Sequence, residues 1–420
     1  MWSLGIVLND HFSFDGVCKT VNKLGLTILL CLGFSLNAPI VFSEESDSSS
    51  VMQVTPVHSS EGVLSLDVKY VDDTVHLLLG KKIKGADSLW YQASGDQGQT
   101  WSEAVNITEG QVIDARISRG NDARLAIQGN HIVAIWMSKK EGGSHNAGPM
   151  VAMASSDKGK TWQQIASPAD WDGAHGFFAM DANADEMSLV WLDSRTKTGD
   201  GATQGLRYSK SIDGGQTWSA NQTLDERSCA CCWNTAQYHG NDFYVLYRDK
   251  DPSDMTLGKV DAQQQWQKLS TVGAFDWDFQ GCPHIGGSIA FDKSHQLIHS
   301  TVGTGHPEKT GTYYLSSSDM GKTWSSPHRL GEETAVHSDL AVSANGDVIA
   351  VWDMITENGF QIVFAESDTQ GQRWSGQVML SARGIRATHP RTVAMKTGFL
   401  VLWTEGEAKK ASYLRIVKVD

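Results

Sequence analysis

The sequence predicts an all-β protein, a seven-bladed β-propeller whose blades are four-stranded and antiparallel. A turn motif of eight residues, Ser-x-Asp-x-Gly-x-Thr-Trp, recurs along the chain. Alternating apolar runs, which are typical of strands, lie before and after each copy. A period of about fifty residues is the signature of a repeat architecture, so the 420 residues are expected to hold one repeat domain.

The start of the chain has the pattern of a secretory leader. A short basic flank precedes an apolar run from Leu24 to Phe34, which is too short to span a membrane comfortably. We assign the leader to residues 1–43, with a possible start at residue 21, and expect a linker and a ring-closing strand in residues 44–60. The mature protein is then expected to be periplasmic or secreted and to lack a membrane span. A retained membrane anchor is the alternative.

The copies of the turn motif give the register of the blades. Four close matches begin at Ser94, Ser155, Ser211 and Ser317, and a fifth begins at Ser367 but has Thr369 in place of Asp. The Asp and Ser side chains are expected to bond backbone N–H groups in a tight turn, with Gly at the position of positive φ. We therefore interpret the Asp residues of the motif as structural rather than catalytic.

The spacing of the strands favours seven blades over six. Five apolar runs end on an aromatic residue, at Trp136, Trp191, Tyr247, Trp352 and Trp403. Seven units of about 53 residues fill the roughly 370 residues that follow the leader, whereas six would need about 62 each. The propeller is expected to span residues 61–420. Its last blade would take its fourth strand from residues 51–57, which closes the ring and removes the exposed sheet edges.

The turn motif is an Asp box, and the chain resembles the sialidase-like superfamily of Asp-box (BNR repeat) propellers. The resemblance covers most of residues 90–375 and is specific for the fold. It is weak for function, because Asp-box propellers include sialidases, other glycan-active enzymes, secreted binding proteins and assembly factors.

The charge of the chain argues against nucleic acid as a partner. The formal net charge is -13, from 48 acidic and 35 basic residues. Nonspecific binding to nucleic acid or to an anionic membrane needs a basic surface.

Cysteine and histidine gather at one predicted place, the rim of the central channel. Loops that lead into the innermost strand of each blade converge there, and aligning these strands on a recurring Ala gives eight equivalent positions. They are His175, Cys229, Cys231, Cys232, Cys282, His284, His337 and His389. Thiolates and imidazoles together bind soft or borderline metals, so the pattern predicts copper, with zinc as the alternative.

Two other interpretations of the cysteines stay open. The four are the only cysteines after the leader, and paired cysteines in exported proteins are usually disulfides. Local pairing within Cys229–Cys232 would be strained, but Cys282 could bridge one of them. A redox-active pair is the third possibility. If the cysteines are disulfide-bonded, no metal cofactor is expected.

Candidate catalytic residues also lie at the start of inner strands. Asp122 or Asp339 could act as a base, and Arg124 or Arg391 could hold an anion. A salt bridge at the end of a strand is an equally good interpretation of each.

The family resemblance implies a second candidate function, an exo-α-sialidase or other glycoside hydrolase. Such an enzyme needs three Arg for the substrate carboxylate, a Tyr–Glu nucleophile pair and an Asp acid. The nearest arginine motif begins at Arg116 but lacks the Pro of the family pattern, and Arg248 and Arg391 could be the other two. Tyr247 with Glu226 is the nearest pair. The Cys-rich loop has no role in this chemistry.

The interpretation we favour is an exported propeller with a Cys/His metal site at the mouth of its channel, in metal handling or a metal-dependent reaction. The alternatives are the sialidase and a noncatalytic scaffold that grips a protein or a glycan. The expected partner at the channel mouth is a metal ion, a small molecule or a glycan.

Overall fold

A computed structural model describes residues 51–53, 61–110, 115–139, 148–196, 203–357, 359–407 and 410–420. The predicted leader and most of the linker lie outside these residues. All of the described residues belong to one compact unit, which extends from Ser49 to Asp420. No helix in the described part of the chain is long and apolar enough to cross a membrane.

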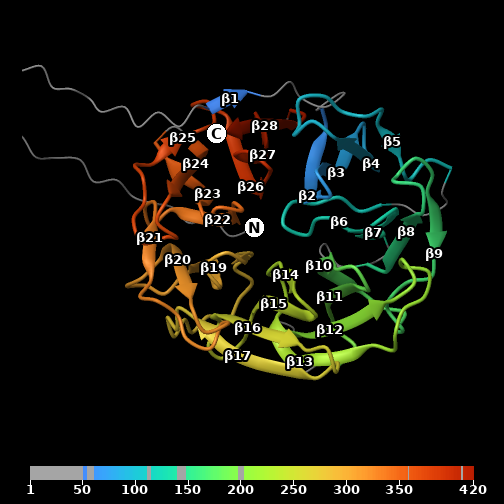
Figure 1. The fold of residues 1–420 in the computed structure, drawn as a ribbon, viewed down its shortest axis with the longest axis horizontal. Coiled ribbons are helices and arrows are strands. Elements are labelled where there is room, and N and C mark those ends of the chain that lie inside the picture. The colour runs from blue at the N-terminus through green and yellow to red at the C-terminus, as the bar shows by residue number, and fades with distance from the viewer. Residues whose placement is uncertain are drawn as a thin grey trace, which may run out of the picture. The chain divides into compact units, whose positions relative to one another are not determined.

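The strands of the described residues form seven four-stranded antiparallel sheets around a ring (Figure 1). The first four blades, each from its inner to its outer strand, have the following bounds. They are β2 (Val63–Val71), β3 (Thr74–Ile83), β4 (Ala86–Ser94) and β5 (Val105–Asn106); β6 (Arg124–Gln128), β7 (His131–Met137), β8 (Met150–Ser155) and β9 (Gln163–Ile165); β10 (His175–Ala182), β11 (Met187–Asp193), β12 (Thr203–Ser211) and β13 (Gln222–Cys229); and β14 (Thr235–His239), β15 (Asp242–Arg248), β16 (Met255–Val260) and β17 (Trp266–Val272).

The last three blades follow the same order. They are β18 (Gly287–Asp292), β19 (Leu297–Thr304), β20 (Gly311–Ser317) and β21 (His328–Leu330); β22 (Ala335–Val342), β23 (Val348–Thr356), β24 (Gly359–Ser367) and β25 (Val378–Met379); and β26 (Arg386–Ala394), β27 (Phe399–Gly406), β28 (Tyr413–Val419) and β1 (Val51–Gln53). The predicted seven-bladed, four-stranded architecture is confirmed.

The ring closes within the seventh blade, where the two ends of the described chain meet. β1 pairs antiparallel with β28, so that Val51 lies opposite Val419. The outer strand of this blade therefore comes from the start of the domain and the other three from its end.

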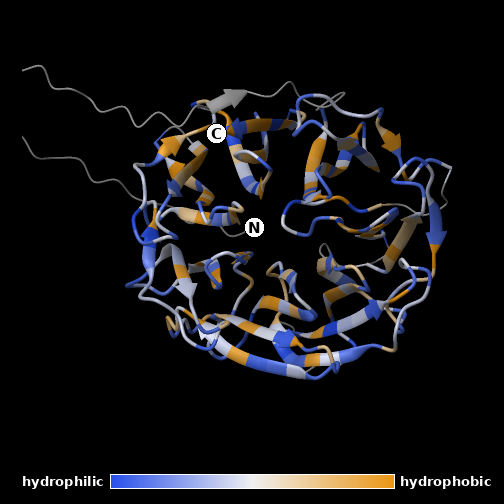
Figure 2. Ribbon diagram, in the orientation of Figure 1, coloured by the Kyte–Doolittle hydropathy of each residue, from blue (hydrophilic) through white to orange (hydrophobic). Residues whose placement is uncertain are grey.

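The hydrophobic core lies between the blades. Seven clusters of buried residues occur in the described chain, and each joins two neighbouring blades. Figure 2 shows the hydrophobic and hydrophilic residues alternating along the strands that form these interfaces. Each blade therefore buries its apolar faces against its two neighbours in the closed ring.

Carboxylates on the inner strands connect successive blades around the channel. Asp67 accepts a hydrogen bond from the backbone N–H of Leu125 in the next blade at 2.9 Å. The same contact recurs from Tyr238 N–H to Asp181 and from Thr392 N–H to Asp339, at 2.9 and 3.0 Å. The repeated bond fixes the height of one inner strand against the next.

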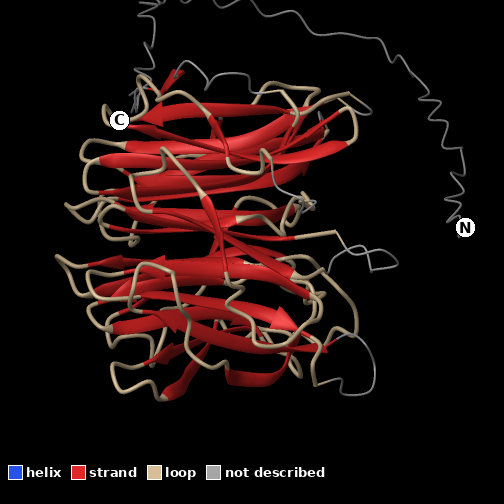
Figure 3. Ribbon diagram, turned by 90° about the vertical axis from the view of Figure 1, so that its right-hand side faces the viewer, coloured by secondary structure: helices blue, strands red, loops and turns tan. Residues whose placement is uncertain are grey.

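The Asp boxes form the turns between the third and fourth strands of their blades. In the first box, Ser94 Oγ accepts from Gly98 N–H at 2.8 Å, and Asp96 accepts from the N–H and hydroxyl of Thr100 at 2.8 and 2.6 Å. These donors lower the pKa of Asp96 to about 2. Since strands alternate in direction, the boxes lie on the face opposite the loops that lead into the inner strands, and Figure 3 shows loops at both faces. The boxes are structural, as expected.

Candidate metal centre at the channel mouth

Four inner strands are irregular near their first residues, where they face the channel mouth. The pairing register of β2, β10, β22 and β26 shifts there, as it does at a β-bulge. His337 lies in the irregular part of β22 and His389 in that of β26, and His389 has a φ of +55°. A bulge turns a side chain away from the regular alternation, so it can aim these imidazoles where a regular strand would not.

The cysteine-rich loop forms a buried group of three sulfurs, called here the thiol triad: Cys229, Cys231 and Cys232. Cys229 is the last residue of β13, and the other two lie in the loop before β14. The Sγ atom of Cys229 lies 3.9 Å from that of Cys231 and 3.4 Å from that of Cys232. A disulfide bond is about 2.05 Å long, and all three are free thiols that are 1 to 2% exposed.

One negative charge is favoured within the thiol triad. The close contacts with the thiols of Cys231 and Cys232 lower the pKa of Cys229. Burial, together with the contact to Cys229, raises the pKa of Cys232. The pKa of Cys231 is also raised, first through its hydrogen bond to Cys229. The guanidinium of Arg248 favours the thiolate as well.

Arg248 is a fixed structural charge beside the triad. Its three donor groups bond the carbonyl oxygens of Ile285, Ser253 and Gly303 at 2.9, 2.6 and 2.7 Å. It is 1% exposed and lies against the ring of Trp277. Because its donors are used by the backbone, Arg248 is not placed to hold a substrate carboxylate.

The other residues considered for a sialidase do not form the expected pair. The hydroxyl of Tyr247 donates to Asp225 at 2.8 Å rather than to Glu226. Glu226 accepts instead from Thr196. Tyr247 is also fully buried, so the Tyr–Glu interpretation is wrong for these two residues.

A second group of possible ligands is called here the histidine pair, His337 and His389, and both are held by Asp353. Asp353 is buried in β23 and accepts from Nδ1 of His337 at 2.7 Å. It also accepts from the backbone N–H groups of His337 and His389, at 3.1 and 2.9 Å. The two imidazole rings stack with their centroids 3.8 Å apart.

His389 is held neutral by its surroundings. Burial lowers its pKa well below the ordinary value, and the charges of His337, Arg391, Arg119 and Arg386 act in the same direction. Its Nδ1 atom is buried and has no hydrogen-bond partner.

Trp233 connects the two groups. It follows Cys232 directly in the sequence, and its ring centroid lies 5.5 Å from that of His337 and 6.1 Å from that of His389. The indole is buried and donates to the carbonyl of Gly287 at 3.3 Å. The channel mouth therefore holds two sets of possible ligands, the thiol triad and the histidine pair. Trp233 follows the triad in sequence and contacts the histidine pair.

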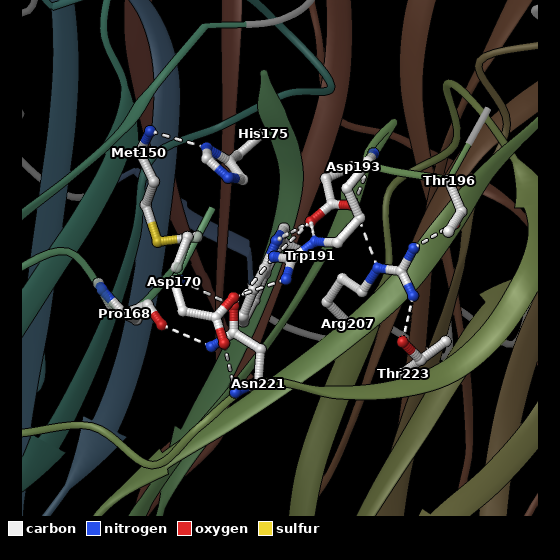
Figure 4. A network of polar contacts seen from close by, with 12 residues as sticks. Met150, Pro168, Asp170, His175, Trp191, Asp193, Thr196, Arg207, Asn221 and Thr223 are labelled. Carbon is white, nitrogen blue, oxygen red and sulfur yellow. Dashed lines mark hydrogen bonds and ion pairs between the residues drawn. The ribbon is translucent and has the colours of Figure 1, made fainter. Parts of the chain in front are cut away.

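The remaining predicted ligands lie apart from both groups. Within the described residues, His175, Cys282 and His284 belong to no group of three possible ligands. His175 accepts from Met150 N–H at 3.1 Å beside the network of Asp193 and its arginine partners that Figure 4 shows, and burial lowers its pKa to about 4. Cys282 and His284 are exposed. The structure thus divides the eight expected residues into a triad, a pair and three separate side chains.

The candidate catalytic residues Asp122, Arg124 and Arg391 bond one another in the channel. Arg391 donates to Asp122 at 3.1 Å, and Arg124 lies 3.8 Å from the same carboxylate. Arg124 also pairs with Asp67 at 3.1 Å. Both arginines line a channel cavity of 310 Å³, which Asp339 also lines. Each guanidinium is paired with a carboxylate of the protein, as in the salt-bridge interpretation.

Sequence reasoning missed Asp353. It lies on a second strand rather than in a loop that leads into an inner strand. The spacing gave no signal for it: Asp193 and Glu405 lie two residues after the aromatic end of their strands and accept from the indoles of Trp191 and Trp403 at 3.1 and 2.9 Å, whereas Asp353 directly follows Trp352.

Comparison with known proteins shows similarity in fold. No protein-family model matches the chain, and no curated protein matches it. A solved ulvan lyase of polysaccharide lyase family PL25 is 11% identical, with a TM-score of 0.57 over 86% of this chain and 94% of that one. A structure of an ulvan lyase of this family bound to -[GlcA(1-4)Rha3S]- is 10% identical, with a TM-score of 0.56 over 88% and 95%.

Sialidases are also among the similar structures. NanB sialidase of Streptococcus pneumoniae is 10% identical, with a TM-score of 0.47 over 87% of this chain and 70% of that one. At these identities the likeness concerns the fold and not the chemistry. The chain is therefore a seven-bladed β-propeller with structural similarity to the PL25 ulvan lyases.

Proposed function

We propose that the protein is an exported copper-binding protein whose thiol triad holds Cu(I). The observation that carries the proposal is the convergence of three buried, unoxidised sulfurs on one small volume, with their ligand atoms within 4.8 Å of one another. Soft thiolate ligands suit Cu(I), Zn(II) and iron–sulfur clusters, and the number of ligands chooses among them.

The number of sulfurs favours Cu(I) over zinc. Structural zinc sites are almost always four-coordinate, and among the described residues no fourth His, Cys, Asp or Glu joins the triad. Cu(I) accepts three thiolates. The neighbouring thiols lower the pKa of Cys229, so this sulfur is expected to bind the cation first as a thiolate.

Burial supports a role in holding the metal in an oxidising compartment. The expected leader supports export, where exposed thiols form disulfides. The triad is almost completely shielded from solvent. Bound copper would therefore be protected from oxidants and from competing ligands in the surrounding solution.

The proposal predicts one Cu(I) per chain at the triad. Reduced protein would be titrated anaerobically with Cu(I) against a chromogenic Cu(I) chelator. We expect Cys231→Ser to weaken Cu(I) binding at least tenfold, because two thiolates replace three. Cys282→Ser is the matched control, since Cys282 is an exposed cysteine of the same chain outside the triad.

Two results would contradict the proposal. One is Cu(I) affinity that is equal in wild type and Cys231→Ser, with both variants folded by circular dichroism. The other is a free-thiol count of two instead of four in unreduced protein, which would mean that the cysteines are paired. If the reduced wild-type protein binds Zn(II) more tightly than Cu(I), the triad is a zinc site and the assignment of copper is wrong.

A further inference from the structure

We infer that His337 and His389 form a second metal site, separate from the thiol triad, for a divalent ion of the borderline class, Cu(II) or Zn(II). Imidazole nitrogen is a preferred ligand of both ions. The two rings are in contact at the channel mouth, at a centroid distance of 3.8 Å. Their ligand atoms and those of Asp353 lie within 4.8 Å of one another.

Asp353 prepares His337 as a ligand. It accepts from Nδ1 of His337 at 2.7 Å, which fixes the proton on Nδ1 and leaves the lone pair on Nε2. Metal-binding histidines nearly always donate their other N–H to a carboxylate or carbonyl, which fixes the tautomer and makes the ligand nitrogen more basic. Asp353 is completely buried, so this contact is maintained away from solvent.

His389 contributes a nitrogen that the protein itself leaves unpaired. Nδ1 of His389 is buried and has no hydrogen-bond partner, a state that is unfavourable for a polar atom. The residue also has a φ of +55° at a break in strand pairing, and the bond from its N–H to Asp353 maintains that conformation. Strained backbone that surrounding contacts enforce is found mainly at functional sites.

The stack implies that one ring moves when the metal binds. The lone pairs of two stacked imidazoles lie in their ring planes, and these planes differ by only 21° and are stacked at a centroid distance of 3.8 Å, so the lone pairs do not converge on one point. A shared ion therefore requires one ring to turn about its Cβ–Cγ bond. Turning His337 would break its bond to Asp353, whereas turning His389 breaks no hydrogen bond at Nδ1. His389 is the ring that turns.

The arginine nearest to this site does not carry an unpaired charge. Arg391 lies against Trp233, but it donates to Asp122 at 3.1 Å, and the carboxylates of Asp339 and Asp67 also act on it. These carboxylates offset the charge of Arg391, while Arg119 and Arg386 also act on His389. Two protein ligands leave coordination positions open, so the ion at this site is exchangeable, unlike an ion enclosed by the triad.

The test separates this site from the triad. Protein without an affinity tag, in which Cys229, Cys231 and Cys232 are all replaced by Ala, would be titrated with Cu(II) and examined by electron paramagnetic resonance. We expect one Cu(II) per chain with hyperfine coupling to imidazole nitrogen. In the same background, His337→Gln and His389→Gln should each weaken Cu(II) binding at least tenfold, and His284→Gln, on an exposed loop, is the matched control.

Zn(II) competition and fluorescence complete the experiment. Zn(II) should displace Cu(II) from the pair, and binding of either ion should change the emission of Trp233, whose ring contacts both imidazoles. The inference is overturned if the Cu(II) spectrum of the folded Ala variant lacks nitrogen coupling, or if both His variants bind like the control. Since the Cu(I) titration of the triad uses the wild-type histidines, the failure of either proposal leaves the other measurable.

Discussion

At the scale of the single residue, buried histidines contribute to how the stability of the ring responds to acid. His76 and His299 occupy equivalent second strands, and each bonds a tyrosine hydroxyl, at 2.7 and 2.6 Å. Burial lowers the pKa of each to about 4, whereas an unfolded histidine has a pKa of about 6.5. Between these values the unfolded chain binds more protons than the folded one. The free energy of unfolding therefore falls as the pH is lowered from about 6.5 to about 4.

Replacing one of these histidines should weaken that pH dependence. We predict that His299→Gln reduces the slope of the logarithm of the unfolding constant against pH by up to about one in this window, because one proton fewer is taken up on unfolding. Urea unfolding at several pH values measures the slope. His328→Gln is the control, since His328 is exposed. An unchanged slope in His299→Gln would show that burial does not hold this imidazole neutral.

At the scale of the structural element, the Asp boxes differ in how completely their turns are bonded. In the fifth box, Thr369 takes the place of Asp and accepts from Arg373 N–H at 2.9 Å. The other four boxes have a Thr hydroxyl that bonds the second carboxylate oxygen, as Thr217 bonds Asp213 at 2.5 Å. This charge-assisted bond is missing from the fifth box, because both of its partners are replaced there.

Completing the fifth box should stabilise the protein. The double replacement Thr369→Asp with Arg373→Thr restores both partners, and we expect the free energy of unfolding to rise by about 0.5–1 kcal/mol. Denaturant unfolding measures it. Thr369→Asp alone is the informative comparison, since it supplies the carboxylate without the hydroxyl. A double variant no more stable than this single one would mean that the side-chain bond contributes nothing at the surface.

The elements also show what the sequence could and could not predict. The Asp boxes and aromatic strand ends predict blade number and strand order, because both depend on local spacing. The thiol triad was predictable because Cys229, Cys231 and Cys232 are close in sequence. Aligning the inner strands placed His337, His389 and His175 at the same rim of the channel. It could not show that only the first two lie together, because sequence spacing does not say how a β-bulge turns a side chain. Asp353 was missed because it comes from a different strand of the blade.

At the scale of the whole molecule, stability depends on closing the ring. Every blade packs against two neighbours through hydrophobic interfaces. The seventh blade has its four strands only when β1 pairs with β28. Without β1, the backbone groups of β28 would form an open sheet edge, which can pair with another chain.

A chain that begins at Glu61 should therefore be less stable and more prone to associate. We expect its melting temperature to fall by about 2 °C or more, because the backbone pairing with β28 is lost. We also expect light scattering that increases with concentration. A chain that begins at Ser49 keeps β1 and is the control. Equal melting and scattering of the two chains would show that the three-residue strand does not contribute.

The pairing of Val51 with Val419 also makes the domain suitable for circular permutation. The start of β1 lies beside the end of β28 in an antiparallel pair, which is the geometry of a hairpin. A linker of a few residues from Asp420 to Val51 would join the two strands, and new termini could be opened at an Asp-box turn on the face opposite the thiol triad. Reporter domains could then be attached on that face without approaching the channel mouth.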